Sequence, residues 1–303
     1  MLRWRLLLGT LFIAALVVWC WLDFVVQRPG AFLAPLALGL TWCGVVEVLD
    51  MFNQKGRYPL PWVIYAGSLL TVTLAGLPVL WPGADSVPGI GRLGWLAIGL
   101  IAGLLLAFIG ELQRYGGHYH ATLNMGLSMF GIAYIGGLMG FIVQLRILSG
   151  KPWDDEGGWG MLALISLIAT VKMSDTGQYT FGRLFGRHKM APNVSPGKTW
   201  EGAIGGMAAA VATAWLVFTW GADQIIGETA PHPHPAAIVA FGVVVAAAGI
   251  LGDLAESMLK RDAGVKDSST WLPGFGGVLD LLDSLLGAAP IVFLFWALRI
   301  VGP

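Results

Sequence analysis

The feature that most constrains the fold is a series of about nine apolar stretches, each near the roughly 20 residues that a helix needs to cross a lipid bilayer. They cover 6–26, 32–51, 61–80, 93–112, 123–145, 159–173, 203–220, 236–251 and 285–301, of which the sixth and eighth are short. A soluble domain carries roughly a quarter charged residues, whereas this chain carries 12%. The pattern predicts an all-α, polytopic transmembrane helical bundle with about nine spans.

The chain shows no internal repeat or low-complexity segment, which favours a single integral unit. We divide it provisionally into amino-terminal membrane helices, 1–150, and carboxyl-terminal membrane helices, 151–303. The first apolar stretch follows Arg3 and Arg5, as a signal peptide would. It is too long for one and has no clear small-residue cleavage site, so we expect a retained first span.

The distribution of basic residues predicts the orientation. With the amino terminus in the cytoplasm, thirteen of the 18 Lys and Arg residues fall on the cytoplasmic side. This excess is typical of cytoplasmic loops, and it places two polar stretches, 172–202 and 252–284, on that side. We therefore expect a multi-pass protein of the cell (inner) membrane with a polar site facing the cytoplasm. The formal net charge is zero, so no field attracts nucleic acid, and no nucleic-acid partner is expected.

The stretch 252–284 holds charges that a membrane span would not tolerate. It contains three aspartates and three basic residues, namely Asp253, Asp280, Asp283, Lys260, Arg261 and Lys266. If 250–261 is helical, Asp253, Ser257 and Lys260 share one face. The glycines of 274–277 predict a turn that brings the carboxylates of both halves together. Carboxylates beside lysine and arginine suit the binding of a metal ion and phosphates.

The stretch 172–202 supplies further polar groups. Lys172, Asp175 and Tyr179 have helical spacing, and Arg183 follows in a region expected to be a basic loop. Ser195 before Pro196 predicts a helix N-cap. A helix amino terminus beside Lys198 suits an anion such as phosphate. An ordinary capped loop explains this stretch equally well in isolation. Its pairing with the acidic stretch favours a single metal–nucleotide site.

Two acidic residues lie near the end of the second apolar stretch, Glu47 and Asp50. Ionisable groups at membrane depth are candidates for function. Because the end of the span is close, interfacial solvation is the simpler explanation here.

Both polar stretches resemble a known family. The matching residues are Ser174-Asp175-Thr176-Gly177, Gly182-Arg183, Phe185-Gly186, Ser195 to Thr199, Glu201-Gly202, Ser257-x-x-Lys260-Arg261, Lys266-Asp267, Pro273-Gly274, Gly276-Gly277, Asp280 and Asp283. Together they resemble the phosphatidate cytidylyltransferases, or CDP-diacylglycerol synthases. The resemblance covers about 110 residues of the carboxyl-terminal half. It implies that CTP and phosphatidate react at the inner leaflet to give CDP-diacylglycerol and pyrophosphate, with Mg²⁺ as cofactor.

The resemblance also implies roles for individual residues. Asp253 and Asp280 would hold the metal with support from Asp283, and the triphosphate would contact Lys260, Arg261 and Lys266. The remaining implied phosphate or substrate ligands are Ser195, Lys198, Asp175, Lys172, Arg183 and Ser257. Asp253, Asp280, Lys260 and Lys198 are the candidate catalytic residues. The resemblance leaves a homodimer open.

Two positions depart from the family pattern. Phe275 stands where the family has histidine, and Leu281 stands where it has arginine. These changes remove a proton carrier and a permanent cation. They leave open a CTP-dependent enzyme for another lipid, such as an archaeol-type phosphate or a polyprenol, or a catalytically weakened paralogue. A transporter is less favoured, because the chain shows neither repeats nor broken midplane helices.

Overall fold

The protein is described by a computed structural model. It covers residues 2–26, 28–81, 83–84, 87, 90–116, 120–148, 153, 157–227, 230–269, 271 and 276–303. The predictions for Phe275 and for the turn residues Pro273 and Gly274 lie outside these residues. The chain forms two compact units. The first contains 1–147 and 262–281, and the second contains 148–261 and 282–303.

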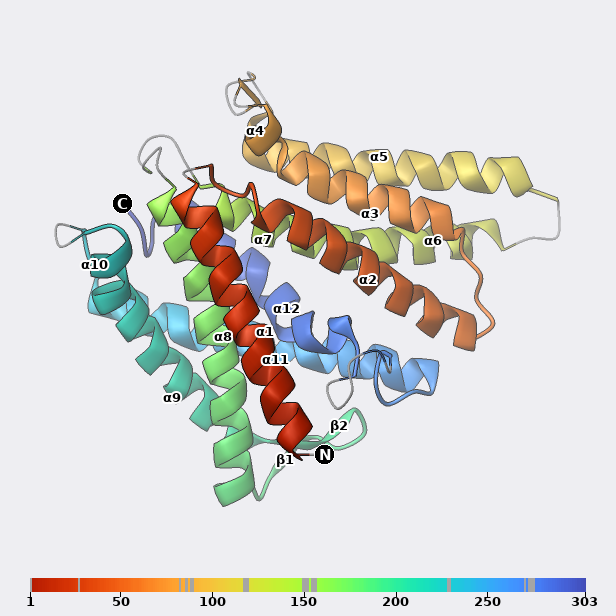
Figure 1. The fold of residues 1–303 in the computed structure, drawn as a ribbon. Coiled ribbons are helices and arrows are strands. Elements are labelled where there is room, and N and C mark those ends of the chain that lie inside the picture. Colours follow the sequence, from red (N-terminus) through yellow and green to blue (C-terminus); the bar gives the residue numbers. More distant parts are fainter. Residues whose placement is uncertain are drawn as a thin grey trace. The chain divides into compact units, whose positions relative to one another are not determined.

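The first unit is built from the amino-terminal helices (Figure 1). They are α1 (Leu2–Val25), α2 (Leu33–Gln54), α3 (Pro61–Ala75), the short α4 (Leu77–Leu80), α5 (Gly91–Arg114), α6 (Ala121–Gly131), a π-helical segment η2 (Ile132–Gly137) and α7 (Leu138–Arg146). The last three form one continuous helical stretch from Ala121 to Arg146. Figure 1 shows α2, α3 and α5 running alongside one another.

Small residues let the helices of the first unit pack closely. A Cβ added to Gly99 of α5 would lie 2.6 Å from the Cα of Thr71 on α3. One added to Gly136 would lie 2.7 Å from the Cα of Ser68. Ile132 is fully buried and packs against Gly67 and Gly103. Packing through small residues is the usual way that helices associate within a bilayer, where burial of apolar surface gives little gain.

A buried ion pair joins α1 to α7 within this unit. Nε of Arg146 lies 2.6 Å from a carboxylate oxygen of Asp23, and both side chains are almost fully buried. The Asp23 carboxylate also accepts hydrogen bonds from the backbone N–H groups of Phe32 and Leu33, where α2 begins. The aspartate thus satisfies donors that the first turn of a helix leaves unpaired.

The second unit contains the remaining helices and a small hairpin (Figure 1). Its elements are α8 (Gly158–Phe185), β1 (Lys189–Ala191), β2 (Ser195–Thr199), α9 (Trp200–Leu216), a π-helical segment η3 (Val217–Gly221), α10 (Ala222–Ile225), most of α11 (Pro235–Ala263) and most of α12 (Val278–Ala297). The strands pair antiparallel, with Lys189 opposite Thr199. Residues 250–261 are helical, as part of α11, which meets the condition under which Asp253, Ser257 and Lys260 share a face.

Glycines also set the packing of the second unit. A Cβ added to Gly177 of α8 would lie 2.9 Å from the carbonyl oxygen of Gly205 on α9. One added to Gly252 of α11 would lie 2.5 Å from the carbonyl oxygen of Asp283 and 3.0 Å from the Cα of Gly287 on α12. The backbones of α11 and α12 are therefore nearly in contact where both helices carry aspartates.

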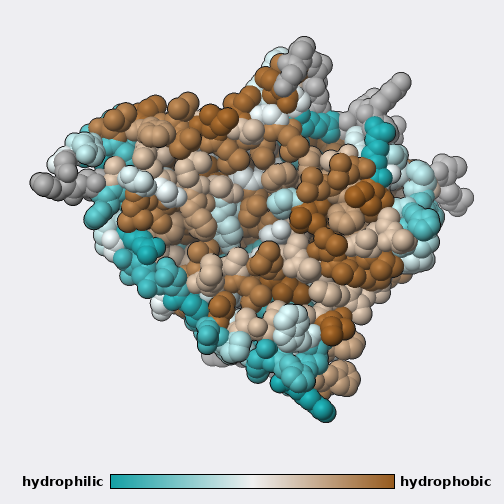
Figure 2. Space-filling view, turned by 180° about the vertical axis from the view of Figure 1, so that it is seen from behind, coloured by the Kyte–Doolittle hydropathy of each residue, from teal (hydrophilic) through white to brown (hydrophobic). Residues whose placement is uncertain are grey.

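The protein is an integral membrane protein by the length and apolarity of its helices. Among the described residues, six helical stretches are long and apolar enough to cross a bilayer. They are Leu33–Gln54, Gly91–Arg114, Ala121–Arg146, Trp200–Ile225, Pro235–Ala263 and Val278–Ala297. Figure 2 shows hydrophobic side chains over wide areas of one face, with hydrophilic side chains gathered mainly at its margins. The all-α polytopic class is confirmed, and the count of nine spans stays a prediction.

Candidate active site

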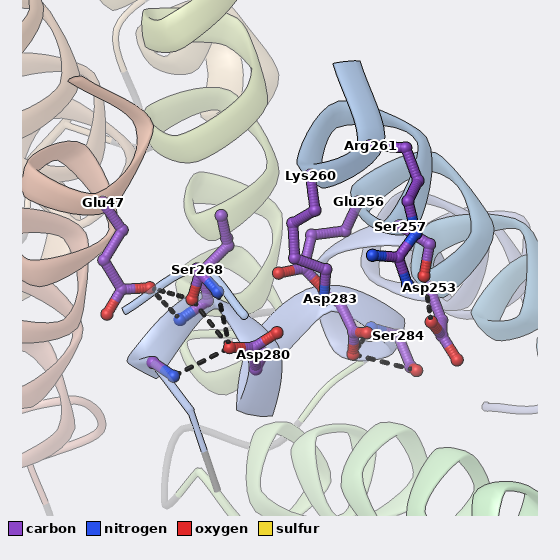
Figure 3. Close-up of polar contacts among 12 residues, drawn as sticks. Glu47, Asp253, Glu256, Ser257, Lys260, Arg261, Ser268, Asp280, Asp283 and Ser284 are labelled. Atoms are coloured by element: carbon purple, nitrogen blue, oxygen red, sulfur yellow. Dashed lines mark hydrogen bonds and ion pairs between the residues drawn. The ribbon is translucent and has the colours of Figure 1, made fainter. Parts of the chain in front are cut away.

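Three helices of the second unit bring carboxylates near one another. Asp175 lies on α8, Asp253 on α11 and Asp283 on α12 (Figure 3 labels the last two). The hydroxyl of Ser284, on α12, is 3.5 Å from Oδ1 of Asp175. The close crossing at Gly252 places Asp253 beside the backbone of Asp283. The sequence predicted that acidic residues of the two polar stretches belong to one site, and these contacts bring three of them together.

The environment of Asp175 disfavours its charged form. Asp175 lies beyond the apolar stretch of α8, which ends at Met173. Burial raises the pKa of its carboxyl group to about 6, and the nearby charges of Asp283 and Asp253 act in the same direction. Lys172 opposes them, with Nζ 3.7 Å from Oδ2 of Asp175. A cation bound among these groups would relieve the repulsion between the carboxylates.

Lys198 is the cation that lies closest to Asp253 among the contacts of the described residues. Its Nζ is 2.6 Å from Oδ2 of Asp253, and its side chain is only 15% exposed. Nζ also lies 3.4 Å from the carbonyl oxygen of Ile250. The other oxygen of Asp253 accepts a hydrogen bond from the hydroxyl of Ser257 at 3.2 Å. Asp253 and Ser257 therefore share a helix face, as their spacing predicted.

The β1–β2 hairpin delivers Lys198 to this position. Lys198 is the fourth residue of β2, and the N-cap of α9 is Thr199, whose hydroxyl accepts from the N–H of Gly202 at 3.1 Å. The predicted N-cap at Ser195 is wrong, because pairing with β1 keeps Ser195 in extended backbone. The carboxylate of Glu201 fastens the base of the hairpin by accepting the N–H groups of the loop residues Arg187 and His188.

The other basic residues predicted for the site do not share the surroundings of Lys198, and each has its own contacts or position. Nζ of Lys260 lies 3.2 Å from Glu256, and both side chains are buried. Arg261 donates from Nε to the carbonyl oxygen of Val194 in the hairpin, at 3.3 Å. Arg183 belongs to α8 and not to a loop, because that helix continues to Phe185. Lys266 is exposed and belongs to the first unit. The sequence reading missed Glu256, although it stands at helical i, i+4 spacing from Lys260.

Asp280 belongs to the first unit, where it organises the chain before α12 (Figure 3). Its Oδ2 accepts hydrogen bonds from the N–H of Ser268 at 3.0 Å, the hydroxyl of Ser268 at 2.8 Å and the N–H of Gly277 at 2.8 Å. Gly276 has a φ of +90°, a conformation that favours glycine. The same serine hydroxyl contacts Glu47 of α2 at 2.7 Å. The sequence reading treated Glu47 as an interfacial residue and missed this contact.

The donor chemistry is compatible with a hard divalent cation. Within the described ranges, no three His, Cys, Asp or Glu side chains are grouped tightly enough to hold a metal without other ligands. Mg²⁺ is commonly bound by one or two carboxylates together with the phosphates of a substrate. Asp253 and Asp283 supply carboxylates of that kind, and the lysine beside them suits phosphate. These residues fit Mg²⁺ provided that a phosphate-bearing substrate completes the site.

Fold and site together define an integral membrane protein with a carboxylate-and-lysine site suited to phosphate chemistry. A family model described as the cytidylyltransferase family matches residues 7–299. The chain therefore belongs to the cytidylyltransferase family.

Three curated relatives with the name phosphatidate cytidylyltransferase show the similarity. The chain is 34% identical to the one from Chlamydia pneumoniae over 298 residues, which cover 95% of this chain and 92% of the relative. It is 37% identical to the one from Pseudomonas aeruginosa over 250 residues, 81% and 79% of the two chains. The match to the one from Haemophilus influenzae is 42% identical over 159 residues, and it spans about half of each chain, 52% and 54%.

Proposed function

We propose that this protein is a phosphatidate cytidylyltransferase, which converts CTP and phosphatidate to CDP-diacylglycerol and pyrophosphate. Its membership of the cytidylyltransferase family and the names of its relatives support the reaction type. The observation that carries the proposal is the ion pair of Lys198 and Asp253, 2.6 Å apart, beside the Asp283 segment of α12. A lysine of the kind that binds phosphate and carboxylates of the kind that bind a metal thus lie side by side, which supports the proposal.

The reaction joins two anions, and its barrier follows from that. A phosphate oxygen of phosphatidate attacks the α-phosphorus of CTP, the bond from that phosphorus to the bridging oxygen of the β-phosphate breaks, and pyrophosphate leaves with the bonding electrons. Charge repulsion opposes the approach, and negative charge develops on the leaving group. Phosphatidate is already ionised near neutral pH, so no strong general base is required. Preorganised cations are the main requirement.

The chain offers a group for each requirement. Asp253 and Asp280 would hold Mg²⁺ with support from Asp283, as the sequence predicted. When bound, the metal supplies Lewis-acid charge to the phosphate oxygens. Lys198 would contact a phosphate oxygen directly. The predicted further contacts to the triphosphate or the lipid phosphate are Lys260, Arg261, Lys266, Lys172, Arg183, Ser195, Ser257 and Asp175.

The membrane setting suits one lipid and one water-soluble substrate. Phosphatidate stays in the bilayer, while CTP arrives from water, so the reacting groups must meet at an interface. The excess of basic residues around both polar stretches favours the cytoplasmic side. We therefore propose that the site faces the cytoplasm from the inner membrane.

Leu281 replaces the arginine of the family pattern, so the test of the proposed function includes other acceptor lipids. Purified protein would be given CTP and Mg²⁺ with phosphatidate, an archaeol-type phosphate or a polyprenyl phosphate in separate reactions. CDP-lipid and pyrophosphate in equal amounts from phosphatidate support the proposed function. Product only from another lipid transfers the proposal to that lipid, and no product from any acceptor overturns it.

A further inference from the structure

Glu47 of α2 makes an unusual set of contacts within the first unit (Figure 3). Its side chain is fully buried. Its carboxylate accepts hydrogen bonds from the hydroxyls of Ser268 and Ser269 at 2.7 and 3.2 Å, and from the N–H groups of Val278 and Leu279 at 2.7 and 2.8 Å. A buried carboxylate is tolerated only when its oxygens are well paired. These partners lie more than 220 positions further along the chain.

The two backbone contacts make Glu47 a cap for another helix. Val278 and Leu279 are the first two residues of α12, and their N–H groups have no partner inside the helix. Oε1 accepts the N–H of Val278, and Oε2 accepts the N–H of Leu279. A negative charge is also favourable at the positive end of the helix dipole. Glu47 therefore fixes where α12 begins.

Ser268 connects Glu47 to Asp280. Its hydroxyl oxygen lies 2.7 Å from Oε2 of Glu47 and 2.8 Å from Oδ2 of Asp280. A serine hydroxyl has one hydrogen to donate, so the two carboxylates share one donor. The backbone N–H of Ser268 also donates to Asp280, at 3.0 Å. A movement of Ser268 away from Glu47 would therefore disturb Asp280 as well.

Gly277 shows how closely the chain fits around this contact. A Cβ added to Gly277 would collide with the hydroxyl of Ser268 and with the carboxylate of Glu47. Its N–H donates to Asp280 at 2.8 Å. The space at this position is filled by the two side chains that connect α2 to α12, so any residue with a side chain would displace one of them.

We infer that Glu47 is a positioning residue for the reaction proposed above, which caps α12 and, through Ser268, holds the carboxylate of Asp280 in the orientation that metal binding requires. This inference rests on the proposed function. Glu47 touches neither substrate nor metal, and it acts through Ser268 and the first turn of α12.

The geometry predicts different effects for two substitutions. Each oxygen of Glu47 accepts one backbone N–H. In Glu47→Gln, the amide NH₂ must therefore face one of those N–H groups, donor against donor, whichever way the amide is turned. Glu47→Asp keeps both acceptor oxygens and withdraws them by about 1.5 Å, one carbon–carbon bond. The aspartate variant should restore a substantial part of what the glutamine variant loses.

The test compares Glu47→Gln, Glu47→Asp and the control Asp50→Asn, which changes an exposed acid on the same helix. For each purified variant, kcat, KM for CTP and the Mg²⁺ concentration for half-maximal rate are measured with phosphatidate. Amide hydrogen exchange at 264–269 and 276–281 is measured without substrate. We expect Glu47→Gln to lower kcat about ten- to a hundredfold, to raise the half-saturating Mg²⁺ concentration and to speed exchange at these positions. Glu47→Asp should be intermediate, and Asp50→Asn should match the wild type.

The outcomes separate this inference from the proposed function. If Glu47→Gln lowered only the yield of folded protein, and kcat and the Mg²⁺ response per folded molecule were unchanged, the role of Glu47 would be purely structural. That result would overturn the inference. Unchanged hydrogen exchange in Glu47→Gln also overturns it. If the wild type itself forms no CDP-lipid, the proposed function fails and the positioning role with it, while faster exchange in Glu47→Gln would still establish the cap.

Discussion

Lys198 and Asp253 form an ion pair of 2.6 Å between a β-hairpin and helix α11, although the two residues are 55 positions apart in the sequence. The lysine side chain is largely buried, so the pair is not an exposed contact that water screens. A buried cation beside a carboxylate that is expected to bind a metal is well placed to receive a phosphate oxygen when nucleotide arrives.

Replacement of Lys198 should impair catalysis. Lys198→Ala removes a charged hydrogen-bond donor, and loss of such a contact costs about 1.5–3 kcal/mol, or roughly ten- to a hundredfold in kcat/KM. Steady-state kinetics with CTP as the varied substrate would measure the change. Lys189→Ala, on the neighbouring strand with an exposed side chain, is the matched control. Equal effects of both substitutions would show that general basic charge, and not this ion pair, matters.

Removal of the charge of Asp280 should abolish turnover and leave the fold intact. In Asp280→Asn the amide oxygen can still accept from Ser268 and Gly277, as Oδ2 of the aspartate does. The protein should therefore elute as folded protein in detergent, whereas CTP-dependent turnover should be lost with the carboxylate charge. Near-normal turnover in this variant would remove Asp280 from the set of metal ligands.

The sequence was informative about helices because bilayer-length apolar runs are long and strongly patterned. It also predicted that Asp175, Lys198 and Asp253 belong to one site. Lys198 forms an ion pair with Asp253, and Asp175 contacts the hydroxyl of Ser284 on α12. The prediction from the sequence was wrong where hydrogen bonding to another segment of the chain determines the local backbone conformation. Ser195 has the residue preference of an N-cap, but strand pairing with β1 moves the helix start to Trp200.

Glu47 shows a second limit of sequence reasoning. Its partners lie more than 220 residues away, and no periodicity links a glutamate on α2 to the serines before α12. From the sequence, Glu47 and Asp50 look alike, yet one is fully buried and the other is exposed. Only the tertiary structure distinguishes a capping carboxylate from a solvated one.

The stability of the metal-free protein should respond to the ionisation of Asp175. Burial raises the pKa of its carboxyl group to about 6, so the folded state binds this proton more tightly than the unfolded state does. The stabilising contribution is complete below about pH 4 and is lost as the pH rises through about 6. Asp175→Asn carries no ionisable group at this position, so its stability does not fall as the pH rises through about 6. In the presence of a chelator, the variant should therefore have a higher melting temperature than the wild type near neutral pH.

Melting temperatures of both proteins in detergent at several pH values would check this prediction. The difference between variant and wild type should shrink towards about pH 4, where the carboxyl group is protonated in both states. The exposed Asp50→Asn variant provides the control for a general change in charge. A difference that does not depend on pH would contradict the assigned cause.

The close crossing of α11 and α12 should not tolerate a methyl group. Gly252→Ala places a Cβ 2.5 Å from the carbonyl oxygen of Asp283, and overpacking of this kind typically costs about 1–3 kcal/mol. Gly249→Ala, one turn earlier on α11, meets no heavy atom closer than 3.7 Å. We expect thermal unfolding in detergent to show a lower melting temperature for Gly252→Ala alone. Equal melting temperatures for the two variants would mean that the helices are not held at this distance.

The most direct test of the proposed reaction follows the label from CTP. Purified wild-type protein and Asp253→Asn would be incubated with phosphatidate, Mg²⁺ and CTP labelled at either the α- or the γ-phosphorus. For the wild type, the α-label should appear in the lipid fraction and the γ-label in pyrophosphate, and both transfers should be lost in Asp253→Asn. Label that stays in CTP with the wild type, or γ-label that enters the lipid, would contradict cytidylyl transfer.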